Sequence, residues 1–272
     1  MDHRQLADEL ISVAGSVGQL QMRHFCSGVT VEQKSDASPV TVADRQSEEM
    51  IVAALATIAP GIPVVAEEAM SEGADLPPSL EHFFLVDPLD GTREFISGRG
   101  EFTVNIALID NGRPVFGLLY APALSRLFMT LGPGEAVEAQ LAAEKGAQGL
   151  GDLELQRLQP RSPDMEALIV VASRSHLDPA TEQLLSKYRV GERVSAGSSL
   201  KFCLLASGEA DLYPRLGRTM EWDTAAGHAI LNAAGGCVLT EQGEPLGYAK
   251  RDVGFANPGF IAWGCAQSAT VS

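Results

Sequence analysis

Basic residues are scarce in this chain. Its 272 residues include 20 Lys and Arg against 35 Asp and Glu, which gives a formal net charge of −15. A nucleic-acid interface needs clustered Lys and Arg to neutralise phosphates, so this balance argues against nucleic acid as a partner. A small phosphorylated substrate stays compatible with it, because bound metal ions can reverse the electrostatic field locally.

Paired cysteines are absent as well. The four cysteines, Cys26, Cys203, Cys237 and Cys265, form no C-x-x-C motif and have no His partner at zinc spacing. Their scatter favours free thiols in a reducing compartment over a disulfide framework or a structural zinc site.

Long hydrophobic runs are missing too. No apolar stretch approaches the ~20 residues that a membrane-spanning helix requires. The first segment, "MDHRQLADEL", is charged from its start and so does not resemble a signal peptide. We therefore expect a cytoplasmic protein. Monomer and homodimer both stay open, as does loose attachment to the cytoplasmic face of a membrane, for which no basic amphipathic helix argues.

Apolar periodicity predicts the secondary structure. We expect helices over residues 2–24, from near 44 to 58, and over about 179–189, 198–207 and 224–234. We expect strands at 62–66, 83–86, 102–110, 115–120, 127–130, 168–173, 193–197, 210–215, 237–240 and 260–263. Residues 132–163 show little periodicity and are predicted to be a partly exposed connection.

The two halves of the chain differ in pattern. The first half reads as antiparallel strands, whereas the second alternates strands and helices. This favours a layered, two-lobed α/β enzyme, with an N-terminal lobe over residues 1–160 and a C-terminal lobe over residues 161–272.

Three acidic positions stand where an apolar segment gives way to a turn. Glu67 follows "IPVVA", Asp87 follows "FFLV", and Asp223 precedes the predicted helix "TAAGHAILNAA". Ligands collect at the carboxyl ends of strands and at helix N-termini. Taken singly, each acid is better explained as a solvated turn or a helix cap. Their combination favours a metal site.

The segment "LVDPLDGTREF" strengthens this interpretation. The fixed φ of Pro88 could place Asp87 and Asp90 on one side of a tight turn. Carboxylates that converge repel one another, so a basic side chain, a shared proton or a cation must compensate them. The carbonyl of Leu89 could face the same way, and carboxylate and carbonyl oxygens suit Mg²⁺ rather than zinc.

A phosphate site is predicted beside the metal. Gly91 permits a close turn, and the backbone N–H groups of Gly91 and Thr92 would open a helical turn. Such donors would hold a phosphate against two metal ions, which could activate water and neutralise the leaving oxygen.

"DPLDGTREF" together with "EWDTAAGHAIL" resembles the inositol-monophosphatase superfamily of Mg²⁺-dependent, lithium-sensitive phosphatases, over nearly the whole chain. The resemblance implies an αβαβα sandwich, two or three Mg²⁺ ions and inhibition by Li⁺. It also implies that the metal ligands are Glu67, Asp87, Asp90, Asp223 and the Leu89 carbonyl.

The resemblance also implies catalytic roles. Glu67 and the Thr92 hydroxyl would orient and help deprotonate the attacking water, and Asp44 would be hydrogen-bonded to Thr92. Phosphate binding falls on the backbone of Gly91 and Thr92.

Within the superfamily the chain is most similar to the 3'(2'),5'-bisphosphate nucleotidases. The segments that carry this likeness are "KSDASPVTVAD", "SRSH" and "GSSLKFCLLASGEADLYPR". Arg215 stands where an inositol phosphatase would offer an acid, and a guanidinium suits a second phosphate. The likeness implies that the substrate also contacts His176, Ser198 and Lys201, besides Glu67, Leu89, Asp90, Gly91, Thr92 and Asp223. The chain departs from the family pattern in one place. Glu67-Glu68 is followed by "AMSEG", where family members often have a serine directly after the acid pair.

These expectations lead to a Mg²⁺-dependent phosphatase that converts 3'-phosphoadenosine 5'-phosphate to AMP and phosphate in sulfur assimilation. Its partner would be this small nucleotide. The alternatives are an inositol, histidinol or fructose-bisphosphate phosphatase with the same chemistry, and a non-catalytic sensor of nucleotide or metal. Lys201 and Arg215 could also be ordinary surface cations, and His176 could be a loop-packing residue.

Overall fold

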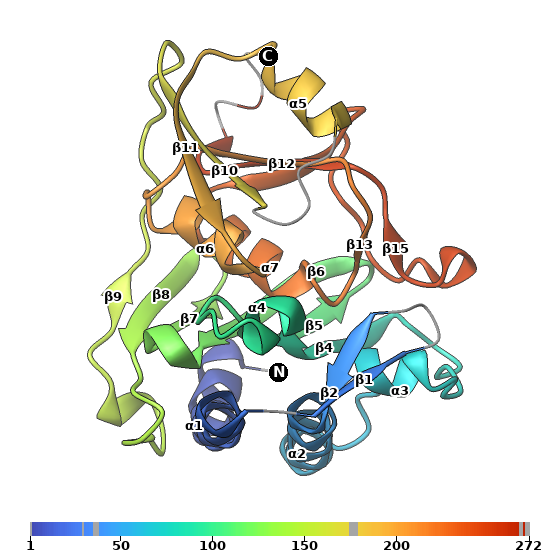
Figure 1. The fold of residues 1–272 in the computed structure, drawn as a ribbon. Helices are drawn as coiled ribbons and strands as arrows, with labels where there is room; N and C mark the ends of the chain where they lie inside the picture. Colours follow the sequence, from blue (N-terminus) through green and yellow to red (C-terminus); the bar gives the residue numbers. More distant parts are fainter. Residues whose placement is uncertain (1, 29, 35–37, 174–178, 267–268, 270–272) are drawn as a thin grey trace.

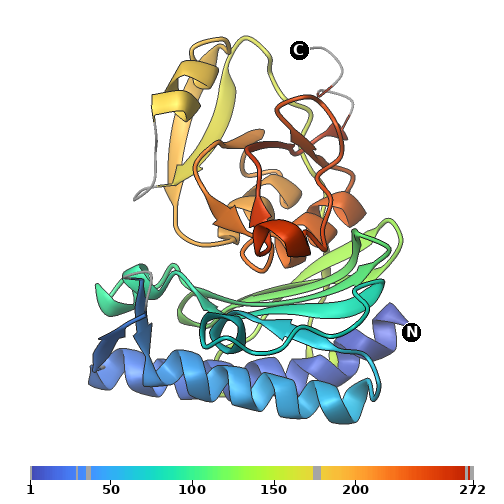
Figure 2. The same ribbon diagram turned by 90° about the vertical axis from the view of Figure 1, so that its right-hand side faces the viewer.

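Layers of helix and sheet alternate through the molecule (Figure 1). The structure is a computed structural model, and it describes residues 2–28, 30–34, 38–173, 179–266 and 269. Helices α1 and α2 cover one face of a seven-stranded sheet, α6 and α7 lie between that sheet and a five-stranded sheet, and α5 lies beyond the second sheet (Figures 1 and 2). This is the predicted αβαβα order.

The helices are α1 (His3–Ser27), α2 (Val42–Ile58), α3 (Glu67–Ser71), α4 (Thr92–Ile96), α5 (Pro179–Leu185), α6 (Leu200–Ala206) and α7 (Ala225–Ala234), with short 3₁₀ turns η1 (Pro122–Leu124), η2 (Leu150–Asp152) and η3 (Arg251–Val253). No described helix is both long enough and apolar enough to cross a membrane.

The larger sheet has the order β3 (Val64–Ala66), β4 (His82–Asp90), β5 (Thr103–Asp110), β6 (Arg113–Ala121), β7 (Arg126–Gly132), β8 (Glu135–Gln140) and β9 (Gln156–Arg157). It is antiparallel except for the parallel pair β3 and β4. Its outer face packs on the apolar stripes of α1 and α2, where Leu10 and Ile51 join Ile106 and Phe116 in one buried cluster.

The smaller sheet has the order β11 (Val190–Ala196), β10 (Leu168–Ser173), β12 (Leu212–Arg215), β16 (Phe260–Trp263) and β14 (Cys237–Thr240). Two short pairs lie apart from both sheets: β1 (Val31–Gln33) with β2 (Pro39–Thr41), and β13 (Thr219–Met220) with β15 (Ala256–Asn257).

The central helices join the two sheets in one core. A buried cluster includes Phe83 and Leu119 of the larger sheet, Phe202 of α6 and Phe260 of the smaller sheet. Helix α7 packs directly on β6, because a Cβ atom at Gly117 would lie 2.2 Å from the carbonyl oxygen of Ala226. Any side chain at position 117 would therefore push α7 off the sheet.

The prediction for residues 132–163 is wrong in part. β8 and β9 extend the larger sheet within this range. β8 reads "EAVEAQ", and its buried residues Ala136, Val137 and Ala139 are small and alternate poorly with polar residues. The pairing of β8 with β7 decides its conformation, so the sequence pattern alone is a weak signal.

Helix α2 begins slightly before the predicted start. Thr41 is its N-cap, and Asp44 at the third helical position completes a capping box with it. Asp44, the residue from which the helix was predicted to start, thus lies one turn inside it.

Candidate active site

Strand β4 carries a β-bulge between the two aspartates of "DPLD". Asp87 pairs with Asn105 and Asp90 with Thr103, so three residue steps along β4 match two along β5. Residues three apart in a regular strand point to opposite faces of the sheet. The extra residue removes this mismatch, and both aspartates line the same pocket. The predicted convergence of Asp87 and Asp90 is therefore confirmed, and its cause is a bulge.

Buried contacts hold the bulge in place. Gln21 of α1 donates its side-chain amide to the carbonyl oxygen of Pro88 at 2.7 Å and to Ser47 Oγ at 3.2 Å. Asp87 Oδ1 accepts the backbone N–H of Leu89 at 3.0 Å. The turn is thus hydrogen-bonded to Gln21 of α1 and to the carboxylate of Asp87.

Glu67 is the first residue of α3. Its N-cap, Ala66, has no side chain that could cap the helix. Glu48 of α2 supplies that function, because its carboxylate accepts the N–H groups of Glu68 at 2.7 Å and Ala69 at 2.8 Å. This contact fixes the start of α3 and so the position of Glu67.

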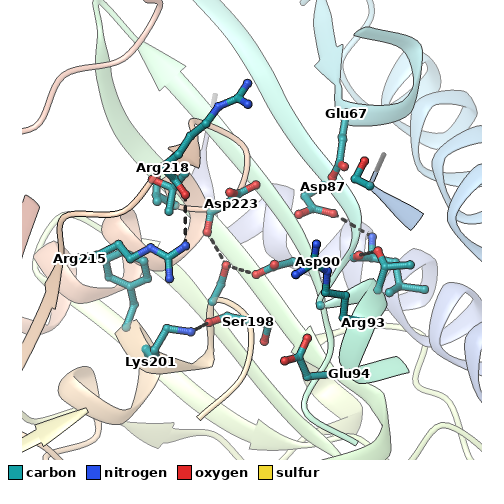
Figure 3. A pocket seen from close by; sticks show the side chains of 18 of the residues that line it. Glu67, Asp87, Asp90, Arg93, Glu94, Ser198, Lys201, Arg215, Arg218 and Asp223 are labelled. Atoms are coloured by element: carbon teal, nitrogen blue, oxygen red, sulfur yellow. Dashed lines mark hydrogen bonds between the residues drawn. The ribbon is translucent and has the colours of Figure 1, made fainter. Parts of the chain in front are cut away.

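Asp223 comes from the loop before α7, and its Oδ2 accepts the N–H of Met220 at 2.8 Å. Glu67, Asp87 and Asp223 each offer an oxygen within 4.8 Å of the other two. Asp90 lines the same pocket and has Oδ2 bound by Ser199 at 2.7 Å. Figure 3 shows all four acids around one space. We call Glu67, Asp87, Asp90 and Asp223 the acidic wall.

Ionised carboxylates packed together as in the acidic wall raise the free energy of the folded protein, because they are partly buried and repel one another. Burial, followed by repulsion from the other acids, raises the pKa values of Asp87 and Asp223 well above the usual range. Burial also raises the pKa of Asp90, although hydrogen bonds from Ser199 oppose the shift. A set of buried oxygen donors with this much mutual repulsion fits a hard divalent cation, which would stabilise all of them as carboxylates.

Lys34 provides part of the compensation, and sequence reasoning missed it. Its Nζ contacts Glu67 Oε1 at 2.7 Å and Glu68 Oε1 at 2.8 Å. Although burial alone lowers the pKa of Lys34, these two acids raise it above its usual value. Among the described residues, no ion pair reaches Asp87 or Asp223. Lys34 therefore compensates the negative charge at Glu67 but does not reach Asp87 or Asp223. It opens "KSDASPVTVAD", a segment that the sequence analysis used only for family likeness.

Thr92 and Asp44 are hydrogen-bonded, as the resemblance implied. Thr92 Oγ1 donates to Asp44 Oδ1 at 3.1 Å and lies 3.3 Å from the carbonyl oxygen of Leu89. The other Asp44 oxygen accepts both the N–H and the hydroxyl of Thr41. Burial raises the pKa of Asp44, whereas the hydrogen bonds from Thr41 and Thr92 lower it. With its hydrogen on Asp44, the Thr92 oxygen keeps lone pairs that can accept from water.

Gly91 has the left-handed conformation that favours glycine, with φ 93°, and directly precedes α4. A Cβ atom there would lie 3.1 Å from the carbonyl oxygen of Glu101. The predicted turn at Gly91 and Thr92, with its N–H groups opening a helix, is confirmed in geometry.

The opposite side of the pocket is basic, and Figure 3 shows Lys201, Arg215 and Arg218 there. We call these three residues the basic wall. Lys201 is 4 % exposed, so the alternative of a surface cation is wrong for it. Its Nζ donates to the carbonyl oxygens of Ala196 and Ser198. Burial lowers its pKa to about 8, despite the opposing effect of Asp90.

Arg215, at the end of β12, donates Nε to the carbonyl oxygen of Gly217 at 3.3 Å and Nη2 to that of Arg218 at 3.1 Å. Ser198 has a left-handed backbone, with φ 47°, and its buried Oγ has no hydrogen-bond partner among the residues that the structure describes. A strained residue with an unpaired polar atom is typical of a ligand site.

The pocket residues that were not predicted include two further cations, Arg93 and Arg218. Arg93 adjoins the "DGT" turn, so its position in the motif was an available signal. Arg218 lies on a loop whose path the sequence pattern does not determine. His176, a predicted substrate contact, lies outside the described residues.

Comparison with known proteins now identifies the fold family. Residues 2–270 match the inositol monophosphatase family. The chain belongs to this family. Family members are metal-dependent, in agreement with the acidic wall.

The curated relatives within this family bear a more specific name. The chain is 42% identical over 257 residues to the 3'(2'),5'-bisphosphate nucleotidase CysQ of Shigella flexneri, covering 94% of this chain and 98% of the relative. It is 41% identical to CysQ of Escherichia coli strain K12, again covering 94% of this chain and 98% of the relative.

Solved structures in this family agree. CysQ from Bacteroides thetaiotaomicron matches with a TM-score of 0.77 and 38% identity, over 96% of this chain and 97% of that chain. An inositol monophosphatase from Thermotoga maritima matches with a TM-score of 0.71 at 24% identity, over 96% of this chain and 92% of that chain, and supports the fold alone.

Proposed function

We propose that this protein is a Mg²⁺-dependent 3'(2'),5'-bisphosphate nucleotidase that hydrolyses 3'-phosphoadenosine 5'-phosphate to AMP and inorganic phosphate. One observation carries the proposal. One pocket of about 280 Å³ is lined by the acidic wall and by the basic wall, which lies across the pocket from Asp87 and Asp90, and Arg93 lies beside Asp90 (Figure 3). A substrate with a scissile phosphate and a second, distant phosphate matches this division of charge.

The acidic wall would hold the metal. Glu67, Asp87 and Asp223 are the ligands that the structure brings closest together, with Asp90 and the Leu89 carbonyl as further oxygen donors. Mg²⁺ in two or three sites is the proposed cofactor. The chemistry it supplies is neutralisation of phosphoryl charge and acidification of water.

Proton transfer is proposed for Thr92 and Asp44. The Thr92 hydroxyl donates to Asp44, so its oxygen is oriented to accept a hydrogen bond from the attacking water. As that water gives its proton to Thr92 Oγ1, the hydroxyl proton of Thr92 would pass to Asp44, whose pKa is raised by burial. Glu67 would orient the water from the metal side. The first turn of α4, at Gly91 and Thr92, would donate N–H groups to the phosphoryl oxygens.

The basic wall would select the substrate. We assign the second phosphate to Arg215, with Lys201 and Ser198 as further contacts. The contact predicted for His176 stays a prediction from the sequence. Both Arg215 and Lys201 are anchored by backbone carbonyls, which limits the entropy lost when an anion binds. An inositol monophosphate has no second anion for this wall. The names of the curated relatives support the same substrate class.

In this proposal each lobe contributes. Residues 1–160 supply Glu67, Asp87, Asp90 and the Thr92–Asp44 pair, and residues 161–272 supply Asp223 and the basic wall. A cytoplasmic location and a monomer or homodimer are part of the proposal, supported only by the sequence features given above.

A phosphate-release panel with Mg²⁺ tests the substrate. It compares 3'-phosphoadenosine 5'-phosphate, its 2'-phosphate isomer, inositol 1-phosphate, histidinol phosphate and fructose 1,6-bisphosphate at equal concentration. We expect kcat/KM for a bisphosphorylated nucleotide to exceed that for the monophosphates, inositol 1-phosphate and histidinol phosphate, by at least about 100-fold, since a charge-paired phosphate contributes about 3 kcal/mol. Fructose 1,6-bisphosphate, which also has a second phosphate, tests whether the site requires a nucleotide. A preference for inositol phosphate would refute the assignment, and nucleotide binding with no release would indicate a sensor.

A further inference from the structure

Ser199 lines the pocket beside the acidic wall. It is 2 % exposed and occupies the N-cap of α6, where its side chain makes no capping hydrogen bond. Its hydroxyl is used elsewhere. Ser199 Oγ lies 2.7 Å from Asp90 Oδ2, which is the dashed contact at Asp90 in Figure 3, and it also contacts the carbonyl oxygen of Asp223.

The direction of the Ser199 proton follows from a third contact. Asn105 of β5 is 1 % exposed and donates its side-chain amide to Ser199 Oγ at 2.9 Å. That donor occupies a lone pair of the hydroxyl, so the single hydroxyl hydrogen must go to Asp90 or to the Asp223 carbonyl. The hydroxyl hydrogen therefore lies between these two acceptors, so that one side chain bridges Asp90 and the Asp223 backbone.

These contacts join segments that are far apart in the sequence. Asp90 ends β4, Asn105 lies opposite Asp87 on β5, and Asp223 precedes α7. The bulge sets Asp90 relative to Asp87, but it does not connect either residue to Asp223. Ser199 is the residue through which Asp90 and the Asp223 backbone meet.

We propose that Ser199 is a positioning residue that holds Asp90 in register with Asp223 and so sets the affinity of the acidic wall for its metal. The proposal rests on the metal-dependent function proposed above. It concerns a residue outside "DPLDGTREF" and "EWDTAAGHAIL", which lines the pocket together with its neighbour Ser198.

The test is Ser199→Ala in the full chain, with Mg²⁺ binding measured by isothermal titration calorimetry. Removing a hydrogen-bond partner of a metal ligand typically costs 10- to 100-fold in affinity, so we expect Kd for Mg²⁺ to rise about tenfold. Ser207→Ala is the matched control, because Ser207 is the C-cap of α6 and its hydroxyl bonds to Leu204 and Glu209, away from the acidic wall. It should leave Kd unchanged, and Ser199→Thr, which keeps a hydroxyl, should recover most of the affinity.

Thermal melts in EDTA separate positioning from a structural role. If Ser199→Ala lowers Tm but binds Mg²⁺ with the wild-type Kd, Ser199 only supports the fold and the proposal is overturned. Asn105→Ala, which leaves the hydroxyl but removes the donor that orients it, provides a second route if Ser199→Ala fails to fold, with an expected rise of about threefold in Kd. An unchanged Kd there would count against the proposal equally.

The two proposals can fail separately. If the wild type binds Mg²⁺ yet hydrolyses none of the phosphate panel, the proposed function is wrong, while the comparison of Mg²⁺ affinities still decides the role of Ser199.

Discussion

The acidic wall and the basic wall of the pocket are built by different means. The acids are placed by backbone geometry, namely a bulge in β4, the start of α3 and the loop before α7. The cations Lys201 and Arg215 are placed by their own side chains, which are fixed on backbone carbonyls. Acids held against one another need an external cation, whereas anchored cations are ready for an anion.

Replacing a buried acid should break the acidic wall with the largest effect. Asp87→Asn keeps the oxygen that accepts the Leu89 N–H but removes a charge. We expect kcat/KM to fall by at least about 1000-fold, since one ligand charge at a phosphoryl site is worth several kcal/mol. The same variant should melt higher than the wild type in EDTA, because burial and repulsion disfavour the ionised Asp87. Phosphate release and melts in EDTA check both parts. Unchanged turnover would exclude Asp87 as a ligand.

Changing the basic wall should alter substrate selectivity and leave the rate of the chemical step nearly unchanged. For Arg215→Ala we expect KM for the bisphosphorylated nucleotide to rise about 10- to 100-fold with kcat changed far less, since removing a charge-assisted phosphate contact costs about 1.5–3 kcal/mol. Arg218→Ala is the matched comparison. Its side chain is exposed, so screening should limit its effect to about threefold. Steady-state kinetics measure both, and equal losses on inositol 1-phosphate would contradict a role in selectivity.

The stability of the metal-free protein should depend on pH through the acids in and beside the acidic wall. Burial, then repulsion from Glu67, raises the pKa of Glu68 to about 7, and the acids of the wall shift in the same direction. A raised folded-state pKa means that the folded state binds more protons than the unfolded state. In EDTA, Tm should therefore fall as pH rises from about 4.5, the ordinary range of a glutamate, through about 7.

Saturating Mg²⁺ should flatten this fall, because the cation stabilises the ionised carboxylates. Lys34→Gln should steepen it, since Lys34 is the cation that lies on Glu67 and Glu68. Fluorescence melts at half-unit pH steps would show both effects. A Tm that rises over this interval in EDTA would have the wrong sign.

The smallest expected effect is inhibition by lithium. A small monovalent cation should occupy part of the acidic wall without supplying the charge of Mg²⁺. At limiting Mg²⁺ we expect millimolar Li⁺ to reduce turnover about two- to tenfold, which corresponds to about 0.4–1.4 kcal/mol. Potassium at equal ionic strength is the control. Equal inhibition by both salts would indicate screening alone.

Most of the acidic wall was predictable because its residues stand at recognisable transitions. Asp87, Asp90, Gly91 and Thr92 share one short motif, and their turn appears in the structure as expected. Lys34 was missed because an isolated lysine in a polar segment has no pattern that assigns it to distant glutamates. β8 was missed because small and charged residues form a strand there only through pairing with β7.

The sequence by itself determined a layered α/β fold, the motif acids and the presence of cations suited to a second phosphate, because these depend on local periodicity and residue type. Its resemblance to the inositol-monophosphatase superfamily supplied the αβαβα order. The tertiary structure alone decided that a bulge aligns Asp87 with Asp90, that Lys34 reaches Glu67, and that Ser199 joins Asp90 to Asp223. Such contacts link residues up to 109 positions apart. Their geometry depends on how the layers pack, and no local pattern encodes that.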